Sequence, residues 1–172
     1  MVVDAHAWIK VMIASVLLMA AVLLAGCSDD NAPLLKGQAA PGFSLPDLQG
    51  HTINVPGDFE DKVIVISFWA DWCPSCKKEM RDLEAIYQKY REQRLVILAI
   101  NIAQERDQAI AFIDDLNLSY PILLDSKGKA TKTYAVSSIP SIFIIDRKGR
   151  LQTRILGEAP RRFLEEAVQR QL

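Results

Sequence analysis

Residues 67–80, SFWADWCPSCKKEM, decide the fold because they join an apolar run to a helical pattern through two cysteines. Residues 63–69 (VIVISFW) are apolar and rich in β-branched side chains, which predicts a strand buried on both faces. From about Pro74 the apolar positions recur at spacings of three and four, which predicts an amphipathic helix. Cys73 and Cys76 therefore lie where a buried strand passes into a helix.

The placement of the two cysteines predicts redox chemistry. Unpaired N–H groups and the macrodipole at a helix N-terminus favour negative charge, so we expect Cys73 to form the reactive thiolate. Cys76 lies one turn further on and continues the buried stripe, so we expect Cys76 to be the buried sulfur and Cys73 the exposed one. Pro74 fits the first helical turn, where a missing N–H costs little. Cys73 should attack a partner disulfide, after which Cys76 attacks Cys73 and releases the partner.

Two other interpretations of the Cys-x-x-Cys pair are weaker. Half a zinc site would need two more ligands, but the chain has no second cysteine pair and only two histidines, His6 and His51. A structural disulfide closing so short a loop would add little stability. We therefore expect His51 to be inert surface and no metal or dissociable cofactor to be needed, the redox group being the Cys73–Cys76 disulfide itself.

The N-terminal residues predict export. Residues 1–26 combine a lysine, an apolar run of 14 residues at positions 11–24 and small residues, as in a secretory signal. A spanning helix needs roughly 20 residues. Residues 24–27, Leu-Ala-Gly-Cys, resemble the lipobox of bacterial lipoproteins, which implies cleavage before Cys27 and its lipidation. Residues 27–37 would then be a tether. The alternative is an uncleaved N-terminal anchor, and both place the remainder outside the cytoplasm.

The remaining residues predict one α/β domain at positions 38–172. Strand and helix patterns alternate, which predicts a mostly parallel centre, and the final hairpin adds an antiparallel edge. A formal charge of −1 gives no sign of nucleic-acid binding. Strands are expected at 43–45, 53–55, 63–69, 95–102, 120–124, 141–145 and 151–156, and helices from about 74, at 107–116, at 129–134 and from Pro160, with residues 163, 164, 167 and 168 on one face.

Residues 67–80 resemble the active-site segment of the thioredoxin superfamily. The nearer match is the TlpA/ResA-like branch of extracytoplasmic, membrane-tethered thiol–disulfide oxidoreductases, over about residues 38–172. The segment APGFSLPDLQG matches the N-terminal hairpin of that branch, and an extra helix and strand lie between Cys76 and Ile139. The resemblance implies a thioredoxin-like three-layer fold, with a mixed central sheet, an N-terminal β-hairpin and a central helix–strand insertion.

The resemblance also implies residues that contact the substrate. Pro140 should follow a cis peptide bond and lie against the disulfide, and backbone groups of Ile139 should pair with the substrate chain. Trp72 should cover the disulfide and meet the partner, while Trp69 should belong to the core. Pro74, between the two cysteines, completes the predicted substrate-binding set.

Glu79 is the predicted proton-transfer group. Its position beside the buried stripe allows a half-buried carboxylate that exchanges the Cys76 proton, or equally a solvated glutamate paired with a lysine. The resembling family carries a functional glutamate at the matching position, which favours the first alternative. Thioredoxins carry a buried aspartate six residues before the first cysteine, where this chain has Ser67. Serine cannot take that charge, so the role is assigned to Glu79.

The resemblance implies a reductase of disulfides in extracytoplasmic proteins such as apocytochrome c. A membrane thiol electron donor would reduce it in turn, and a lipid anchor would hold it at the periplasmic side of a membrane. A disulfide-forming oxidase remains open. A copper-handling module would need wider cysteine spacing and a distal histidine, and a peroxidase would need a P-x-x-x-T-x-x-C run, so both are less favoured.

Overall fold

The computed structural model describes residues 34–172. The predicted signal peptide (1–26), the lipidation of Cys27 and most of the tether (27–37) lie outside the described residues and stay predictions. Within residues 34–172, no helix combines the length and the apolar character needed to cross a membrane.

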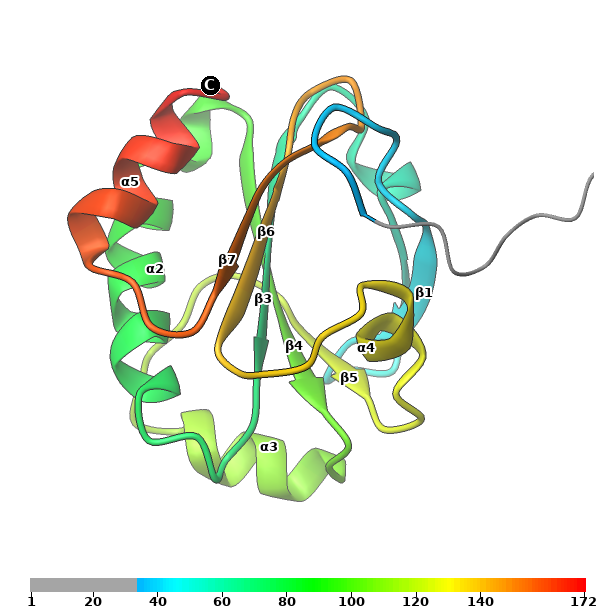
Figure 1. The fold of residues 1–172 in the computed structure, drawn as a ribbon. Coiled ribbons are helices and arrows are strands. Elements are labelled where there is room, and N and C mark those ends of the chain that lie inside the picture. The colour runs from blue at the N-terminus through cyan, green and yellow to red at the C-terminus, as the bar shows by residue number, and fades with distance from the viewer. Residues whose placement is uncertain (1–33) are drawn as a thin grey trace, which may run out of the picture. The chain divides into compact units, whose positions relative to one another are not determined.

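A five-stranded mixed sheet forms the centre of the domain (Figure 1). Its strand order is β5-β4-β3-β6-β7, with β4 parallel to β3 and β5, and β6 antiparallel to β3 and β7. The central strand β3 is buried along its whole length, as its unbroken apolar sequence predicted. The strands are β3 (Val63–Trp69), β4 (Leu95–Ile102), β5 (Ile122–Asp125), β6 (Ser141–Ile145) and β7 (Leu151–Leu156).

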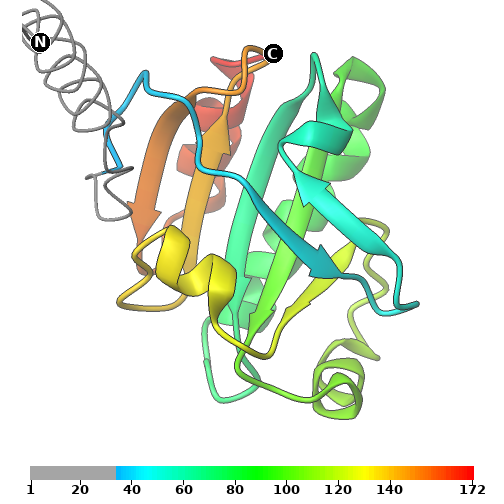
Figure 2. The same ribbon diagram turned by 90° about the vertical axis from the view of Figure 1, so that its right-hand side faces the viewer.

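Helices and a hairpin cover the two faces of the sheet, which confirms the three-layer prediction (Figures 1 and 2). Helices α2 and α5 cover one face, α4 and the β1–β2 hairpin cover the other, and α3 lies beyond one end of the sheet (Figure 1). The bounds are β1 (Phe43–Pro46), β2 (Thr52–Val55), α2 (Cys76–Tyr90), α3 (Arg106–Ile113), α4 (Lys129–Thr133), α5 (Arg161–Gln169), and the 3-10 helices η1 (Gly57–Phe59) and η2 (Arg91–Gln93).

The alternation of side chains along β3 divides the core in two. Val65 and Trp69 pack toward α2 and α5, whereas Ile66 and Phe68 pack toward α4 and the hairpin. Helix α5 buries Leu164, Ala167 and Val168, but the prediction that Phe163 shares this face is wrong, because its side chain is 46% exposed. The buried stripe follows the 3.6-residue period, and Phe163 lies at its margin.

One end of the sheet brings together the ends of β3, β4 and β7 and the start of β6. Strands β3 and β4 finish side by side there, because Trp69 pairs with Asn101. Strand β6 starts there, because Ser141 pairs with Phe68, and β7 finishes there, because Leu156 pairs with Ser141. This is the lower end of the sheet in Figure 1. Sites in open α/β sheets form at such carboxyl ends of parallel strands.

The opposite end of the sheet receives the chain from its N-terminal side. The Gly37 N–H donates to the Leu151 carbonyl, and the Leu151 N–H donates to the Gln38 carbonyl at 2.9 Å. The next residue, Ala39, forms an antiparallel bridge with Arg150. The segment before β1 is thereby fastened to the start of β7.

Candidate active site

Cys73 and Cys76 form a disulfide in the connection between β3 and α2. Their Cα atoms lie 5.4 Å apart, and a turn closed by the Cys73 N–H on the Ala70 carbonyl at 3.2 Å precedes them. Helix α2 starts at Cys76 rather than at Pro74, so Cys73 lies just outside the helix. Cys76 is the more buried cysteine, as predicted, but Cys73 is only 3% exposed and is not the open sulfur we expected. The bond holds the Cys73 sulfur against that of Cys76, which lies inside the core.

The predicted substrate-binding residues lie at the same end of the sheet. Trp72 is 67% exposed and Pro74 is exposed, so both present their side chains to solvent beside Cys73. Pro140 is buried, follows a cis peptide bond as the resemblance implied, and accepts the Gly157 N–H at 2.8 Å. Ile139 packs against the apolar cluster that contains both cysteines. A second cis bond, Val55–Pro56, lies outside this region and was not predicted.

Glu79 lies inside the core beneath the first turn of α2. Glu79 is 2% exposed, and the Ser67 hydroxyl donates a hydrogen bond to Glu79 Oε1 at 3.1 Å. Within the described residues, Glu79 Oε2 has no hydrogen-bond partner. Burial raises the pKa of Glu79 to about 7, although the hydrogen bond from Ser67 acts in the opposite direction. Glu79 is therefore a buried carboxyl that titrates near neutral pH, and the alternative of a solvated glutamate is wrong.

Charged groups on the surface surround this buried carboxyl. Lys78 Nζ lies 3.0 Å from Asp82 Oδ2 and 3.8 Å from Glu158 Oε1. The negative charges of Asp82 and Glu158 add to the effect of burial on the pKa of Glu79, whereas Lys78 lowers that pKa. Because Lys78 is shared with two other carboxylates, it does not neutralise Glu79 as a dedicated partner.

An aromatic and ionic cluster fixes the start of α2 to α3. Trp69 is buried, as predicted, and stacks on Phe112 of α3 with ring centroids 5.0 Å apart. Lys77 Nζ lies 4.9 Å from the centre of the Phe112 ring and 2.9 Å from Asp115 Oδ1. Arg81 contacts the same carboxylate at 3.3 Å. Lys77 is therefore held by α3 and by the residues that directly follow it.

Two buried polar residues at the end of β4 were missed by the sequence analysis. The Gln104 Oε1 atom accepts the Asp71 N–H at 3.0 Å and the Asn101 Nδ2–H at 2.7 Å. Asn101 is fully buried and Gln104 is 8% exposed. The available signal was an asparagine within the apolar run LVILAINI, since a buried polar group needs a partner.

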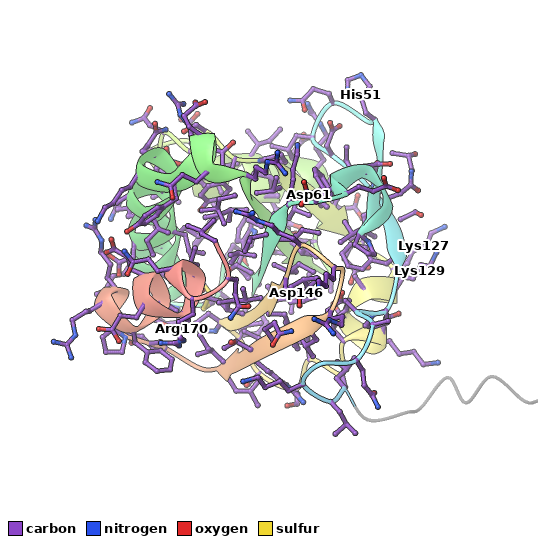
Figure 3. All side chains as sticks on the ribbon, turned by 90° about the horizontal axis from the view of Figure 1, so that it is seen from above. His51, Asp61, Lys127, Lys129, Asp146 and Arg170 are labelled. Atoms are coloured by element: carbon purple, nitrogen blue, oxygen red, sulfur yellow. A yellow bond between two sulfur atoms is a disulfide. The ribbon has the colours of Figure 1, made fainter. Side chains whose placement is uncertain are left out.

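His51 contributes nothing to this end of the sheet. It lies at the periphery of the domain, in the turn between β1 and β2, where its Nδ1 is 3.2 Å from Asp47 Oδ2 (Figure 3). Across residues 34–172, no three His, Cys, Asp or Glu side chains are grouped so as to hold a metal ion.

Comparisons with known proteins agree with this geometry. Residues 36–154 match the model of the AhpC/TSA family. The thiol–disulfide oxidoreductase ResA of Bacillus cereus (strain ATCC 10987 / NRS 248) is 36% identical over 135 residues, which cover 78% of this chain and 77% of that protein. The ResA protein of Bacillus anthracis is 34% identical over 144 residues, covering 83% and 82% of the two chains.

Solved structures share the fold. StoA from Bacillus subtilis superposes with a TM-score of 0.64 at 27% identity, covering 78% of this chain and 98% of that one. A protein described as a DsbE-type thiol:disulfide interchange protein from Chlorobium tepidum gives a TM-score of 0.76 at 27% identity, covering 80% and 98%. The family match, the ResA relatives and the disulfide between a buried strand and a helix agree with one another. The chain therefore belongs to the AhpC/TSA family and, within it, to the ResA-like thiol–disulfide oxidoreductases of thioredoxin-like fold.

Proposed function

We propose that Cys73 and Cys76 are the redox pair of this oxidoreductase and that it reduces disulfides in extracytoplasmic partner proteins, apocytochrome c being one candidate. The observation that carries the proposal is the buried carboxyl of Glu79, which titrates near neutral pH one helical turn after Cys76. Such a group is suited to accept a proton from a buried thiol at physiological pH.

The proposed cycle starts with the reduced pair. The Cys73 thiolate attacks one sulfur of a partner disulfide, which forms a mixed disulfide and releases the other partner sulfur as a thiolate. The Cys76 thiol gives its proton to Glu79, and the resulting thiolate attacks Cys73 Sγ. The Cys73–Cys76 disulfide forms, and the partner leaves with both sulfurs reduced. Two electrons pass to the partner, and a membrane thiol donor restores the Cys73–Cys76 pair.

The exposed groups beside the disulfide support binding of a polypeptide. Trp72 presents a large apolar ring to solvent next to Cys73. Tryptophan in such a position is enriched among residues that dominate protein contacts. In our proposal Trp72, Pro74, Ile139 and Pro140 line the path of the partner chain across the disulfide.

Location and anchoring follow from the N-terminal sequence. The signal-like residues 1–26 and the lipobox-like cysteine support a protein that acts outside the cytoplasm, held at the periplasmic side of a membrane by lipid on Cys27.

Trapping of the mixed disulfide tests the roles of the two sulfurs. In a chain that carries Cys27→Ser throughout, so that this third cysteine cannot react, Cys76→Ser should accumulate a covalent complex with a disulfide-containing peptide. Cys73→Ser should accumulate none, because only Cys73 initiates attack. Equal trapping by both variants, or by neither, would overturn the assignment.

The direction of electron flow is tested by the reduction potential of the pair. Equilibration against glutathione or dithiothreitol should give a value near that of thioredoxin, roughly −270 mV or lower, for a reductase. A value toward roughly −120 mV, as in a strong oxidant, would instead support the disulfide-forming oxidase. The reductase proposal would then be abandoned.

A further inference from the structure

The side-chain oxygen of Gln104 joins the end of β4 to the turn that precedes α2 and contains Cys73. Gln104 Oε1 accepts the backbone N–H of Asp71 at 3.0 Å and the side-chain N–H of Asn101 at 2.7 Å. Asp71 belongs to the turn that the Cys73 N–H closes on the Ala70 carbonyl. Gln104 thereby fixes the turn two residues before Cys73, although the chain separates Asp71 from Gln104 by 33 positions.

The surroundings of Gln104 indicate a constrained site rather than a solvated loop. Gln104 is 8% exposed, and a glutamine is seldom this buried unless its amide is paired. Asn101 lies on β4 directly beside Trp69, the last residue of β3, so the amide bridges two adjacent strand ends. The turn is therefore anchored to a fully buried residue of the central sheet.

The backbone before Gln104 is also unusual. Ala103 has a φ of 56°, in the left-handed region that alanine rarely adopts. Its N–H donates to the Asp125 carbonyl of β5 at 3.2 Å. Such strain persists only where the surrounding structure imposes it, and it concentrates at functional sites. This left-handed residue directly precedes Gln104, the residue whose side chain reaches Asp71.

We propose that Gln104 is a positioning residue that holds the turn preceding Cys73 and thereby favours closure of the Cys73–Cys76 disulfide. This inference rests on the proposed redox role of that pair. Closing a disulfide depends on the effective concentration of one sulfur at the other, which falls when either is free to move. Helix α2 begins at Cys76 and does not include Cys73. In our proposal the turn that carries Cys73 therefore sets the distance between the two sulfurs once the disulfide is reduced.

The test compares two substitutions of Gln104. Gln104→Met keeps the length of the side chain but removes the acceptor oxygen, whereas Gln104→Glu keeps an acceptor at the same position. The equilibrium constant for closing the disulfide against glutathione should fall about tenfold in Gln104→Met, which is a rise of about 30 mV in reduction potential. Gln104→Glu should remain within threefold of the wild type. Gln93→Met, an exposed glutamine in η2, is the matched control and should change nothing.

The outcomes separate this inference from the proposed function. If the wild type does not exchange disulfides with glutathione through Cys73 and Cys76, the proposed function fails. If the wild type exchanges and Gln104→Met keeps its equilibrium constant, only the positioning role fails. A purely structural role would destabilise the oxidised and reduced forms alike and leave that constant unchanged. An equal fall of the constant in Gln104→Glu and Gln104→Met would overturn the role assigned to the acceptor oxygen.

Hydrogen exchange provides a measurement that needs no variant, in case Gln104→Met does not fold. In the wild-type chain, oxidised and reduced, the Asp71 amide should exchange at least tenfold more slowly than an unprotected amide. Exchange of the Asp71 amide at the unprotected rate in the reduced protein would overturn the proposal. The hydrogen bond from Asp71 to Gln104 would then be absent when the disulfide closes.

Discussion

The Ser67 hydroxyl donates a hydrogen bond to Glu79 Oε1 at 3.1 Å within the apolar layer between β3 and α2. Both residues are buried, and they lie 12 positions apart in the chain on either side of the cysteine pair. The helix thus places a buried carboxyl beside the strand position that holds Ser67.

Replacing the carboxyl of Glu79 should remove the pH dependence of the resolving step. In Glu79→Gln the amide cannot accept the Cys76 proton, so release of the partner should slow by about 10²-fold near pH 7.5, the lower end of typical general-base effects. Rapid-mixing measurements of mixed-disulfide decay from pH 5 to 9 should show an inflection near 7 in the wild type that the variant lacks.

The control for that measurement is Glu92→Gln, which neutralises an exposed carboxylate beyond the end of α2. It should retain the wild-type profile. An inflection near pH 7 that survives in Glu79→Gln would show that another group accepts the proton.

Removing the Ser67 hydroxyl should move the same inflection upward. The hydrogen bond from Ser67 lowers the pKa of Glu79, since it stabilises the charged carboxylate. Ser67→Ala should therefore raise the inflection by about one pH unit, because hydrogen bonds to charged groups contribute roughly 1.5 kcal/mol or more. Ser44→Ala, which loses an exposed hydroxyl bonded to Asn54, should leave it in place. A downward movement in Ser67→Ala would contradict the assigned geometry.

Stability should fall as pH rises through the range in which Glu79 ionises. The folded pKa, about 7, lies above the ordinary value of 4.5, so the folded state binds more protons than the unfolded state between these values. The stabilising contribution is complete below pH 4.5 and is lost by about pH 7. At 1.36 kcal/mol per pKa unit, the loss is roughly 3 kcal/mol.

The stability of Glu79→Gln relative to the wild type should consequently increase between pH 4 and pH 8, by up to about 3 kcal/mol. Urea unfolding of the oxidised proteins at a series of pH values measures this difference. A difference that stays constant from pH 4 to pH 8 would show that the Glu79 pKa is not raised.

The stacking of Phe112 on Trp69 should contribute measurably to stability. Phe112→Ala removes the ring that contacts both Trp69 and Lys77, and its loss should cost about 2 kcal/mol, below the range for a fully buried phenylalanine. Phe163→Ala, whose ring is 46% exposed, should cost less than about 0.5 kcal/mol. Chemical denaturation distinguishes the two, and equal losses would refute a specific role for the stack.

Local patterns were enough to predict the strands and the α-helices, whereas the 3-10 helices η1 and η2 were not predicted. The apolar run of β3 and the periodic stripe of α2 are properties of consecutive residues, and the predicted elements follow one another along the chain as observed. Helix boundaries were less accurate: α2 begins at Cys76 instead of about Pro74, because the chain first makes the turn that ends at Cys73. Capping and turns depend on the geometry of individual hydrogen bonds, which hydrophobic periodicity does not encode.

Contacts between distant segments could not be predicted in the same way. The burial of Glu79 was left open because its depth depends on how closely α2 packs on β3. The pairing of Asp71 with Gln104 joins two segments that share no periodic pattern. The burial of Cys73 was likewise not predicted, because it depends on how the turn before α2 packs on the core.

Residues 37–39 are attached at the start of β7, at the end of the sheet opposite to the cysteines. The chain joins the sheet beside Leu151, whereas Leu156, at the other end of that strand, lies with the disulfide turn. Five steps of extended chain separate them, about 17 Å. The length of β7 therefore separates the end of the sheet that residues 37–39 join from the end that carries the cysteines. In our proposal a partner therefore meets the cysteines at the end of the sheet opposite to the one that residues 37–39 join.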